Sequence, residues 1–222
     1  MTLYIVATPI GNLEDFSFRA LRILSEVDYI LSEDTRVAQK LLSHYQIKKP
    51  LISFHHHSGP NKYEAVLRDL EKGKSVALIS DAGTPNISDP GGQLVDFIRN
   101  KNAAIKIEAI PGPSAIITAL SVSGIKADKF IFFGFLPHKK GRNKMLQEIL
   151  EAKYPVVFYE SKHRIKKLLE EIKASGTKKK VMIFRELTKM FYSFYNQDIA
   201  ELCKIFEQDK DASKGEFTII IH

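Results

Sequence analysis

Two aspartates lie in a loop that follows a buried apolar strand and also carries glycines, prolines and hydroxyl side chains. The loop spans residues 80–92 and contains Asp81 and Asp89, directly after the apolar run Val76–Ile79. In open α/β sheets, ligands bind beyond the carboxyl ends of strands, where backbone N–H groups and helix N-termini converge. The loop is longer than a strand-to-helix turn requires. Two interpretations stay open, a ligand-binding loop and a structural turn.

Comparable polar segments follow other apolar runs, as expected if several strand ends contribute to one site. Carboxylates at such positions can accept protons or hydrogen bonds, but Asp34 and Ser114 could equally cap helices, and Arg36 could be a solvated first-turn residue. The segments are Thr8-Pro9-Ile10-Gly11-Asn12, Glu33-Asp34-Thr35-Arg36 and Pro111-Gly112-Pro113-Ser114-Ala115.

Three adjacent histidines, His55, His56 and His57, suggest a metal site, but neighbours on an extended chain point to alternate sides. We therefore expect no metal. The single cysteine, Cys203, cannot form an internal disulfide, which fits a reducing cytoplasm. No run approaches the roughly 18 apolar residues needed to span a bilayer, and the N-terminal segment does not resemble a signal peptide.

The first half alternates five apolar strands with helices, which predicts a parallel sheet covered by helices on both faces. The second half contains a further set of strands, of which residues 191–196 are expected to be antiparallel, their aromatic side chains packing rather than stacking on bases. The predicted fold is therefore α/β with two domains, residues 1–123 and a smaller mixed-sheet domain, residues 124–222. No Gly-x-Gly pair occurs, so the dinucleotide fingerprint is absent.

The charge is distributed unevenly. The net charge is +7 over 222 residues, and residues 126–189 hold 17 of the 33 Lys and Arg but only 7 of the 26 Asp and Glu. The second domain is therefore the one expected to face a polyanion, although such asymmetry can also serve solubility alone. Its basic loop, residues 138–144, supplies four cations suited to contact such a polyanion: Lys139, Lys140, Arg142 and Lys144.

Taken together, these segments resemble the tetrapyrrole methylase superfamily. Further motifs are similar to the branch of that family that methylates a cytidine ribose of small-subunit ribosomal RNA. The resemblance covers nearly the whole chain in order. Besides the segments above and Ser80–Gly91, it rests on Gly134-Phe135-Leu136-Pro137, Phe158-Tyr159-Glu160-Ser161, Arg185-Glu186-Leu187-Thr188-Lys189 and Lys214-Gly215-Glu216.

The resemblance implies two α/β domains with S-adenosyl-L-methionine in the cleft between them, a homodimer and 16S ribosomal RNA as partner. With this partner, the four cations of the basic loop are expected to contact RNA phosphates. Arg36, Arg185 and Lys189 are further residues expected at the RNA. For the general base, Asp34 and Glu160 are preferred among five carboxylates that also include Glu33, Asp81 and Asp89. The cofactor-binding residues implied by the resemblance are Pro9, Asp81, Ala82, Gly83, Thr84, Ile87, Ser114 and Ala115, with Tyr159, Leu187 and Gly215 around the adenine.

Two departures from the family pattern affect these expectations. The family usually carries His-Asp/Glu-His-Asn where this sequence has His55-His56-His57-Ser58, and it tends to continue beyond the last strand, whereas this sequence stops at His222. The basic second domain is then expected to supply more of the RNA contact. The alternatives are a methyltransferase of the same fold acting on a tetrapyrrole or other small acid, and a non-catalytic RNA-binding factor.

Overall fold

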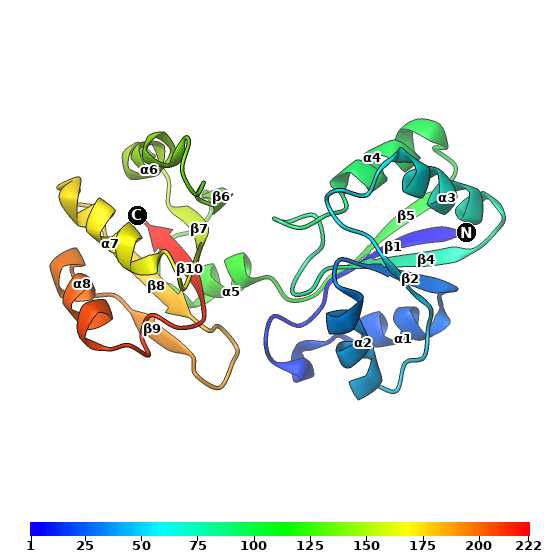
Figure 1. The fold of residues 1–222 in the computed structure, drawn as a ribbon, viewed down its shortest axis with the longest axis horizontal. Coiled ribbons are helices and arrows are strands. Elements are labelled where there is room, and N and C mark those ends of the chain that lie inside the picture. Colours follow the sequence, from blue (N-terminus) through cyan, green and yellow to red (C-terminus); the bar gives the residue numbers. More distant parts are fainter. The chain divides into compact units, whose positions relative to one another are not determined.

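Each of two compact units, Met1–Ser114 and Ala115–His222, is built around its own five-stranded sheet in a computed structural model that describes residues 1–222 (Figure 1). The predicted α/β fold with a parallel and a mixed sheet is confirmed. The helix after the first sheet, α5 (Ala115–Val122), belongs to the second unit, where it contacts strand β10. The predicted domain boundary at residues 123/124 lies after this helix.

All strands of the first sheet run parallel, in the order β3-β2-β4-β1-β5. Connections therefore leave the neighbouring strands β1 and β4 in opposite directions, which makes their carboxyl ends a topological switch point. The strands are β1 (Thr2–Val6), β2 (Tyr29–Ser32), β3 (Leu51–Ser53), β4 (Ser75–Ile79) and β5 (Lys106–Ile110).

Helices cover both faces of this sheet because each presents one apolar side. One buried cluster joins α1 and α2 to the sheet, and a second joins α3 and α4 to its other face. Side chains cap two of these helices, since Ser17 accepts from the Ala20 N–H and Asp34, a predicted cap, accepts from the Arg36 N–H. The elements are α1 (Phe18–Glu26), α2 (Thr35–His44), α3 (Pro60–Glu71) and α4 (Gly92–Lys101), with a short 3₁₀ turn at Leu13–Asp15.

The second sheet is mixed, in the order β6-β7-β10-β8-β9. Strand β10, the last along the chain, occupies the centre and runs antiparallel to both β7 and β8, whereas β6 and β7 are parallel and β9 is antiparallel to β8. The strands are β6 (Ile131–Phe135), β7 (Val156–Ser161), β8 (Val181–Arg185), β9 (Ser193–Tyr195) and β10 (Glu216–Ile221).

Helices α6 (Arg142–Glu151), α7 (Ile165–Ala174) and α8 (Ile199–Gln208) cover this sheet through one buried cluster. Two boundaries differ from prediction. Helix α6 begins at Arg142, within the predicted basic loop, and β7 includes Glu160 and Ser161, although the apolar run Val156–Tyr159 predicts a strand that ends before them. No helix in the chain is long and apolar enough to cross a membrane.

Candidate functional site

Three loops of the first unit meet at the carboxyl ends of its central strands. Thr8, after β1, and Gly83, after β4, form an isolated antiparallel bridge in which each N–H donates to the other's carbonyl, at 2.9 and 3.1 Å. The Thr8 hydroxyl also donates to the Ser80 carbonyl at 3.2 Å. The Thr84 hydroxyl donates to the carbonyl of Pro113, after β5, at 3.2 Å. The predicted convergence of these strand ends is therefore present.

The approach is so close that side chains are excluded at two glycines. A Cβ at Gly112 would lie 2.9 Å from the Ala7 Cβ. At Gly83, where φ is +81°, a Cβ would lie 3.3 Å from a methyl carbon of Ile10. Glycine at these positions lets the backbones of the loops after β1, β4 and β5 lie in contact with one another.

The loop between β4 and α4 holds unusual backbone conformations. Asn86 and Ser88 have positive φ values of 72° and 66°, and a Cβ at Gly91 would lie 2.8 Å from Leu78. Left-handed conformations at residues other than glycine cost on the order of 1–3 kcal/mol each and persist only where the surroundings enforce them. The strain favours a ligand-binding loop over a structural turn.

Asp34 and Asp81 are brought together by a hydrogen bond, the Asp34 N–H donating to Asp81 Oδ1 at 3.1 Å. The Asp34 side chain caps α2 and binds the Arg36 guanidinium, with Oδ2 and Nη2 2.6 Å apart. These bonds stabilise its ionised form and hold the pKa of Asp34 at about 2. A carboxylate so acidic and so engaged is a weak proton acceptor.

Asp89 has the opposite character. Burial and the nearby Glu33 and Asp81 carboxylates raise the pKa of Asp89. A hydrogen bond from Ser80 opposes them in part, and the resulting pKa is about 6. A carboxylate with a pKa near neutrality is suited to accept a proton at physiological pH. Among the carboxylates that the sequence left as alternatives, Asp89 has the environment best suited to a base.

Unpaired backbone donors lie beside these acids. The N–H groups of Ala82 and Thr84 donate to no acceptor within the protein, and Ala82 is exposed. Free amides complement a carboxylate, and Asp81 complements an ammonium group or a ribose hydroxyl. The donor and acceptor set therefore fits a zwitterionic ligand such as the predicted cofactor. Two further predicted residues belong to these loops. Ile87, between β4 and α4, is exposed, and Pro9, after β1, is buried.

In the second unit, the predicted adenine-binding residues gather at one edge of the sheet. Tyr159 lies near the end of β7, Leu187 follows β8, and Gly215 precedes β10, which runs antiparallel to both. Gly215 has φ +94° and a Cβ there would lie 2.6 Å from the Glu186 side chain. Phe135, at the end of β6, is exposed and places its ring 5.3 Å from that of Tyr159. Phe135 was not among the predicted residues, although it stands inside the Gly134-Phe135-Leu136-Pro137 motif.

Glu160 belongs to a buried ion-pair network. Its side chain is fully buried and pairs with Arg142 Nη1 at 3.2 Å and with Arg164 Nε at 2.8 Å. Arg142 is buried too, and its Nη2 lies 2.9 Å from Glu171. Burial argues against Glu160 as a general base and against Arg142 as a phosphate contact. The network instead ties α6 and α7 to β7.

The remaining residues predicted to contact RNA differ in whether their side chains already have a partner within the protein. Lys139, Lys140 and Lys144 are exposed and form no ion pair. Lys189 is held by Glu186 and Glu216, at 3.0 and 2.8 Å. Arg185 forms no ion pair but donates to backbone carbonyls, and exposed Arg36 is paired with Asp34.

A model of the family described as Tetrapyrrole (Corrin/Porphyrin) Methylases matches residues 2–203. The chain belongs to this family. It is 47% identical over 221 residues to the Ribosomal RNA small subunit methyltransferase I of Pasteurella multocida, covering 99% of this chain and 78% of that protein. It is 43% identical to the protein of the same name from Thermotoga maritima, covering 99% of this chain and 97% of that one.

Solved structures of other proteins show the same fold at low sequence identity. A cobalt precorrin-4 methyltransferase matches with a TM-score of 0.69 at 17% identity, covering 99% of this chain and 94% of that chain. A diphthine synthase matches with a TM-score of 0.72 at 11% identity, covering 99% and 89%. These proteins establish the architecture, and the family makes the chain a methyltransferase.

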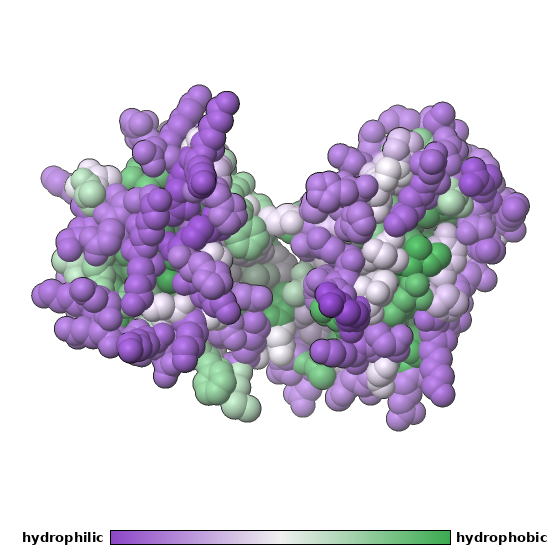
Figure 2. All heavy atoms as spheres, viewed as in Figure 1, coloured by the Kyte–Doolittle hydropathy of each residue, from purple (hydrophilic) through white to green (hydrophobic).

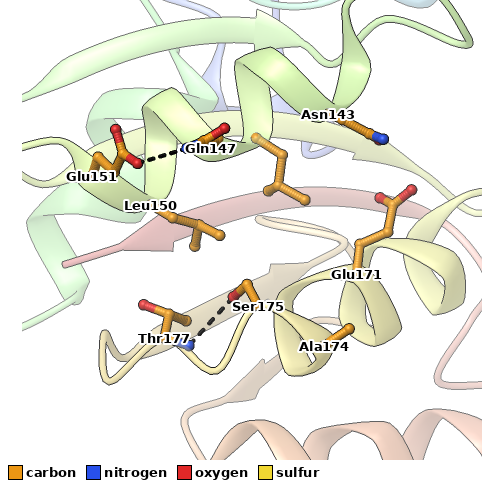
Figure 3. A pocket seen from close by; sticks show the side chains of 9 residues that line it. Asn143, Gln147, Leu150, Glu151, Glu171, Ala174, Ser175 and Thr177 are labelled. Atoms are coloured by element: carbon orange, nitrogen blue, oxygen red, sulfur yellow. Dashed lines mark hydrogen bonds between the residues drawn. The ribbon is translucent and has the colours of Figure 1, made fainter.

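Two other features of this methylase stand apart from the strand-end loops. His55, His56 and His57 form a turn closed by Ser58, whose hydroxyl accepts from the His55 N–H at 3.0 Å, and no group of three or more potential ligands is placed to hold a metal. A pocket of about 600 Å³ opens between α6 and α7, over Leu146 and Leu150 (Figure 3). Its carboxylates are engaged, and it includes no residue predicted for cofactor or RNA.

Proposed function

We propose that this methylase transfers a methyl group from S-adenosyl-L-methionine to the 2′-oxygen of a cytidine ribose in 16S ribosomal RNA. The observation that carries the proposal is the 47% identity, over 99% of the chain, to a ribosomal RNA small subunit methyltransferase I. The alternative of a tetrapyrrole or small-acid substrate has no comparable support, because the cobalt precorrin-4 methyltransferase shares 17% identity and therefore the fold alone.

The loops of the first unit supply the groups that the cofactor's methionine and ribose require. In this proposal the free amides of Ala82 and Thr84 receive the carboxylate, and Asp81 accepts from the ammonium group or from a ribose hydroxyl. Tyr159, Leu187 and Gly215 hold the adenine. The proposed set is completed by Pro9, Gly83, Ile87, Ser114 and Ala115.

The bound cofactor supplies an activated methyl group on a sulfonium, and no metal is needed for its transfer. The chain's main contribution is to hold the ribose hydroxyl in line with that methyl group, for which intramolecular models suggest about 7–11 kcal/mol. A hydroxyl is a poor nucleophile near neutral pH, so a base within reach adds about 10²- to 10⁴-fold. We assign this role to Asp89, because the pKa of Asp89 is raised to about 6 while that of Asp34 is lowered to about 2.

The second unit is proposed to hold the RNA. It carries 20 Lys and Arg against 13 Asp and Glu, whereas the first unit carries 13 of each, so the whole net charge of +7 lies in residues 115–222. Lys139, Lys140 and Lys144 are the cations best placed for phosphate contact, because they are exposed and unpaired. Arg36, Arg185 and Lys189 have internal partners and are assigned a smaller share. The proposal includes a homodimer acting in the cytoplasm.

The test is to map 2′-O-methylcytidine in small-subunit ribosomal RNA by mass spectrometry, with and without the gene. We expect one methylated cytidine to disappear in the deletion strain and to return with the wild-type gene. The purified protein and the cofactor should also restore it on subunits from that strain. An unchanged map would remove the proposed substrate and leave the methylase fold without an assigned acceptor.

A further inference from the structure

The loop between β8 and β9 presents an apolar tip to solvent. Met190 is 91% exposed, Phe191 66% and Tyr192 45%. The loop projects from the second unit in Figure 1, and apolar side chains form a protrusion at the same place in Figure 2. The aromatic side chains of residues 191–196 were predicted to pack. Phe194 does place its ring 4.8 Å from that of Phe184, in a stacked arrangement, but the tip is not covered in this way.

Hydrogen bonds hold the backbone of the tip in place. Arg185 Nη1 donates to the Phe191 carbonyl at 2.9 Å, and Arg185 Nε donates to the Lys214 carbonyl at 2.6 Å. The Tyr192 N–H donates to the Lys189 carbonyl at 3.1 Å, and Lys189 Nζ bridges Glu186 and Glu216. These bonds fix the backbone while leaving the Phe191 ring in solvent. A preorganised aromatic side chain loses little conformational entropy when it binds a partner.

The tip also lies close in sequence to the residues predicted to bind the adenine. It follows Leu187 within a few residues, at the edge where Tyr159 and Gly215 lie. In the function proposed above, that end of the sheet holds the adenine of the cofactor, and the same unit is proposed to hold the RNA. An exposed aromatic side chain on this unit is therefore available to bases of the RNA.

We propose, resting on the function proposed above, that the Met190–Tyr192 tip is a base-stacking element, with Phe191 stacking on an unpaired nucleotide of the RNA substrate. Single-stranded RNA is recognised largely in this way, through bases splayed out onto aromatic rings. Stacking on Phe191 would offset part of the free energy needed to remove a nucleotide from its neighbours before its ribose is methylated.

Charge favours RNA over a second copy of this chain as the occupant of the tip. The unit that carries the tip has the entire net positive charge of the protein, and Arg185, at the base of the tip, forms no ion pair. Like charge disfavours a contact between two copies of this unit at the tip, whereas a polyanion is attracted. The tip thus adds an apolar contact to an electrostatically favoured encounter.

The first experiment uses the absence of tryptophan from the sequence. Phe191→Trp introduces a single indole at the tip, and Phe18→Trp introduces one at a residue of the first unit that is 92% exposed, as a matched control. We expect a single-stranded oligoribonucleotide carrying the 16S sequence around the target cytidine to quench the tip indole and to leave the control unchanged. An abasic oligomer with the same number of phosphates should quench neither. Equal quenching by the abasic oligomer would overturn the proposal.

The second experiment measures RNA affinity in the otherwise unmodified chain. Phe191→Ala should weaken binding of the base-bearing oligomer by about 5- to 150-fold, the loss expected for one stacked base. Its affinity for the abasic oligomer, its salt dependence and its cofactor affinity should stay at wild-type values. If wild type itself fails to bind the RNA, the proposed function fails; if wild type binds and Phe191→Ala binds equally well, only the stacking proposal fails.

Sedimentation of Phe191→Ala tests whether a second copy of this chain, rather than RNA, binds the tip. We expect Phe191→Ala and wild type to have the same oligomeric state at every protein concentration. A shift to a smaller species, with RNA affinity recovering as protein concentration rises, would show that the tip joins two copies of the chain, which would overturn the proposal.

Discussion

Thr8 and Gly83 exchange both of their backbone hydrogen bonds, although 75 residues separate them in the sequence. This bridge spans the switch point between β1 and β4, beyond the last paired residues Val6 and Ile79. It joins the two loops into one rigid base, so the cofactor contacts proposed for Asp81, Ala82 and Thr84 are positioned by the sheet itself.

Replacing Asp81 with Ala should weaken cofactor binding by about 1.5–3 kcal/mol, the usual contribution of a hydrogen bond to a charged group. The variant also loses the acceptor for the Asp34 N–H, so the neighbouring loop is affected too. Calorimetric titration with S-adenosyl-L-methionine measures the effect. Asp96→Ala, an exposed aspartate on α4, serves as control and should bind like wild type. Unchanged binding in Asp81→Ala would mean that this loop does not hold the cofactor.

Methyl transfer should decline as the pH falls through about 6, because Asp89 takes up a proton there and can no longer accept one from the ribose. In Asp89→Asn the rate should be about 10²- to 10⁴-fold lower at neutral pH, without this acidic limb. Single-turnover rates between pH 5 and 8 provide the measurement. If Asp34→Asn removed the limb while Asp89→Asn retained it, the assignment would move to Asp34.

The same carboxyl group should leave a signature in stability. Its pKa is raised in the folded chain, so the folded state binds the proton more tightly than the unfolded state between about pH 4 and 6. Wild type should therefore lose stability relative to Asp89→Asn as the pH rises through this window, by about 1 kcal/mol after allowance for partial solvent screening. Urea unfolding at pH 4 and 7 measures the difference, and a constant difference would exclude the shift.

Arg142→Met should destabilise the second unit by about 3–5 kcal/mol, because the buried Glu160 would lose one of its two ion-pair partners. Arg164 remains to compensate in part, which favours the lower end of the range. Urea unfolding followed by circular dichroism is the measurement. Lys144→Met, at an exposed position of the same helix, should change stability by less than about 0.5 kcal/mol. Similar stability of the two variants would contradict the role given to the network.

Changing Lys139, Lys140 and Lys144 together to Ser should flatten the dependence of log RNA affinity on log salt by up to about 2–3, at 0.7–0.9 for each lost phosphate contact. Cofactor affinity should stay within about twofold of wild type, since screening weakens long-range charge effects at physiological salt. The matched control changes three exposed lysines of the first unit, Lys40, Lys48 and Lys72. A salt slope equal to that of wild type would place the phosphate contacts elsewhere.

Gly112→Ala should cost about 1–3 kcal/mol of stability, because its Cβ would lie 2.9 Å from that of Ala7, which has no side-chain torsion to adjust. The displaced loop should also weaken cofactor binding. Thermal unfolding and calorimetry test both effects, with Gly59→Ala as the control, since Gly59 has φ −84° and its Cβ would meet nothing within 4 Å. If Gly112→Ala had the stability and the cofactor affinity of wild type, the close approach of these loops would not be required for either.

The parallel sheet was predictable because short apolar runs ending in Gly and Pro alternate with helical spacing, and the Ser17 and Asp34 caps mark where α1 and α2 begin. Burial of individual charged residues was not. Arg142 sits among lysines in the sequence, and its pairing with Glu160 depends on how α6 folds back over β7. The pKa difference between Asp34 and Asp89 likewise arises from tertiary surroundings that no local pattern encodes.

The central place of β10 sets an order for synthesis of the chain. The first unit has all its strands once residue 110 has been made, so its sheet can close while the remainder is still being translated. The second sheet is different, because β7 and β8 do not pair with each other and must wait for residues 216–221 to come between them. Until then, two apolar strands each have one unpaired edge, and a premature stop before residue 216 would leave a folded first unit attached to an aggregation-prone second one.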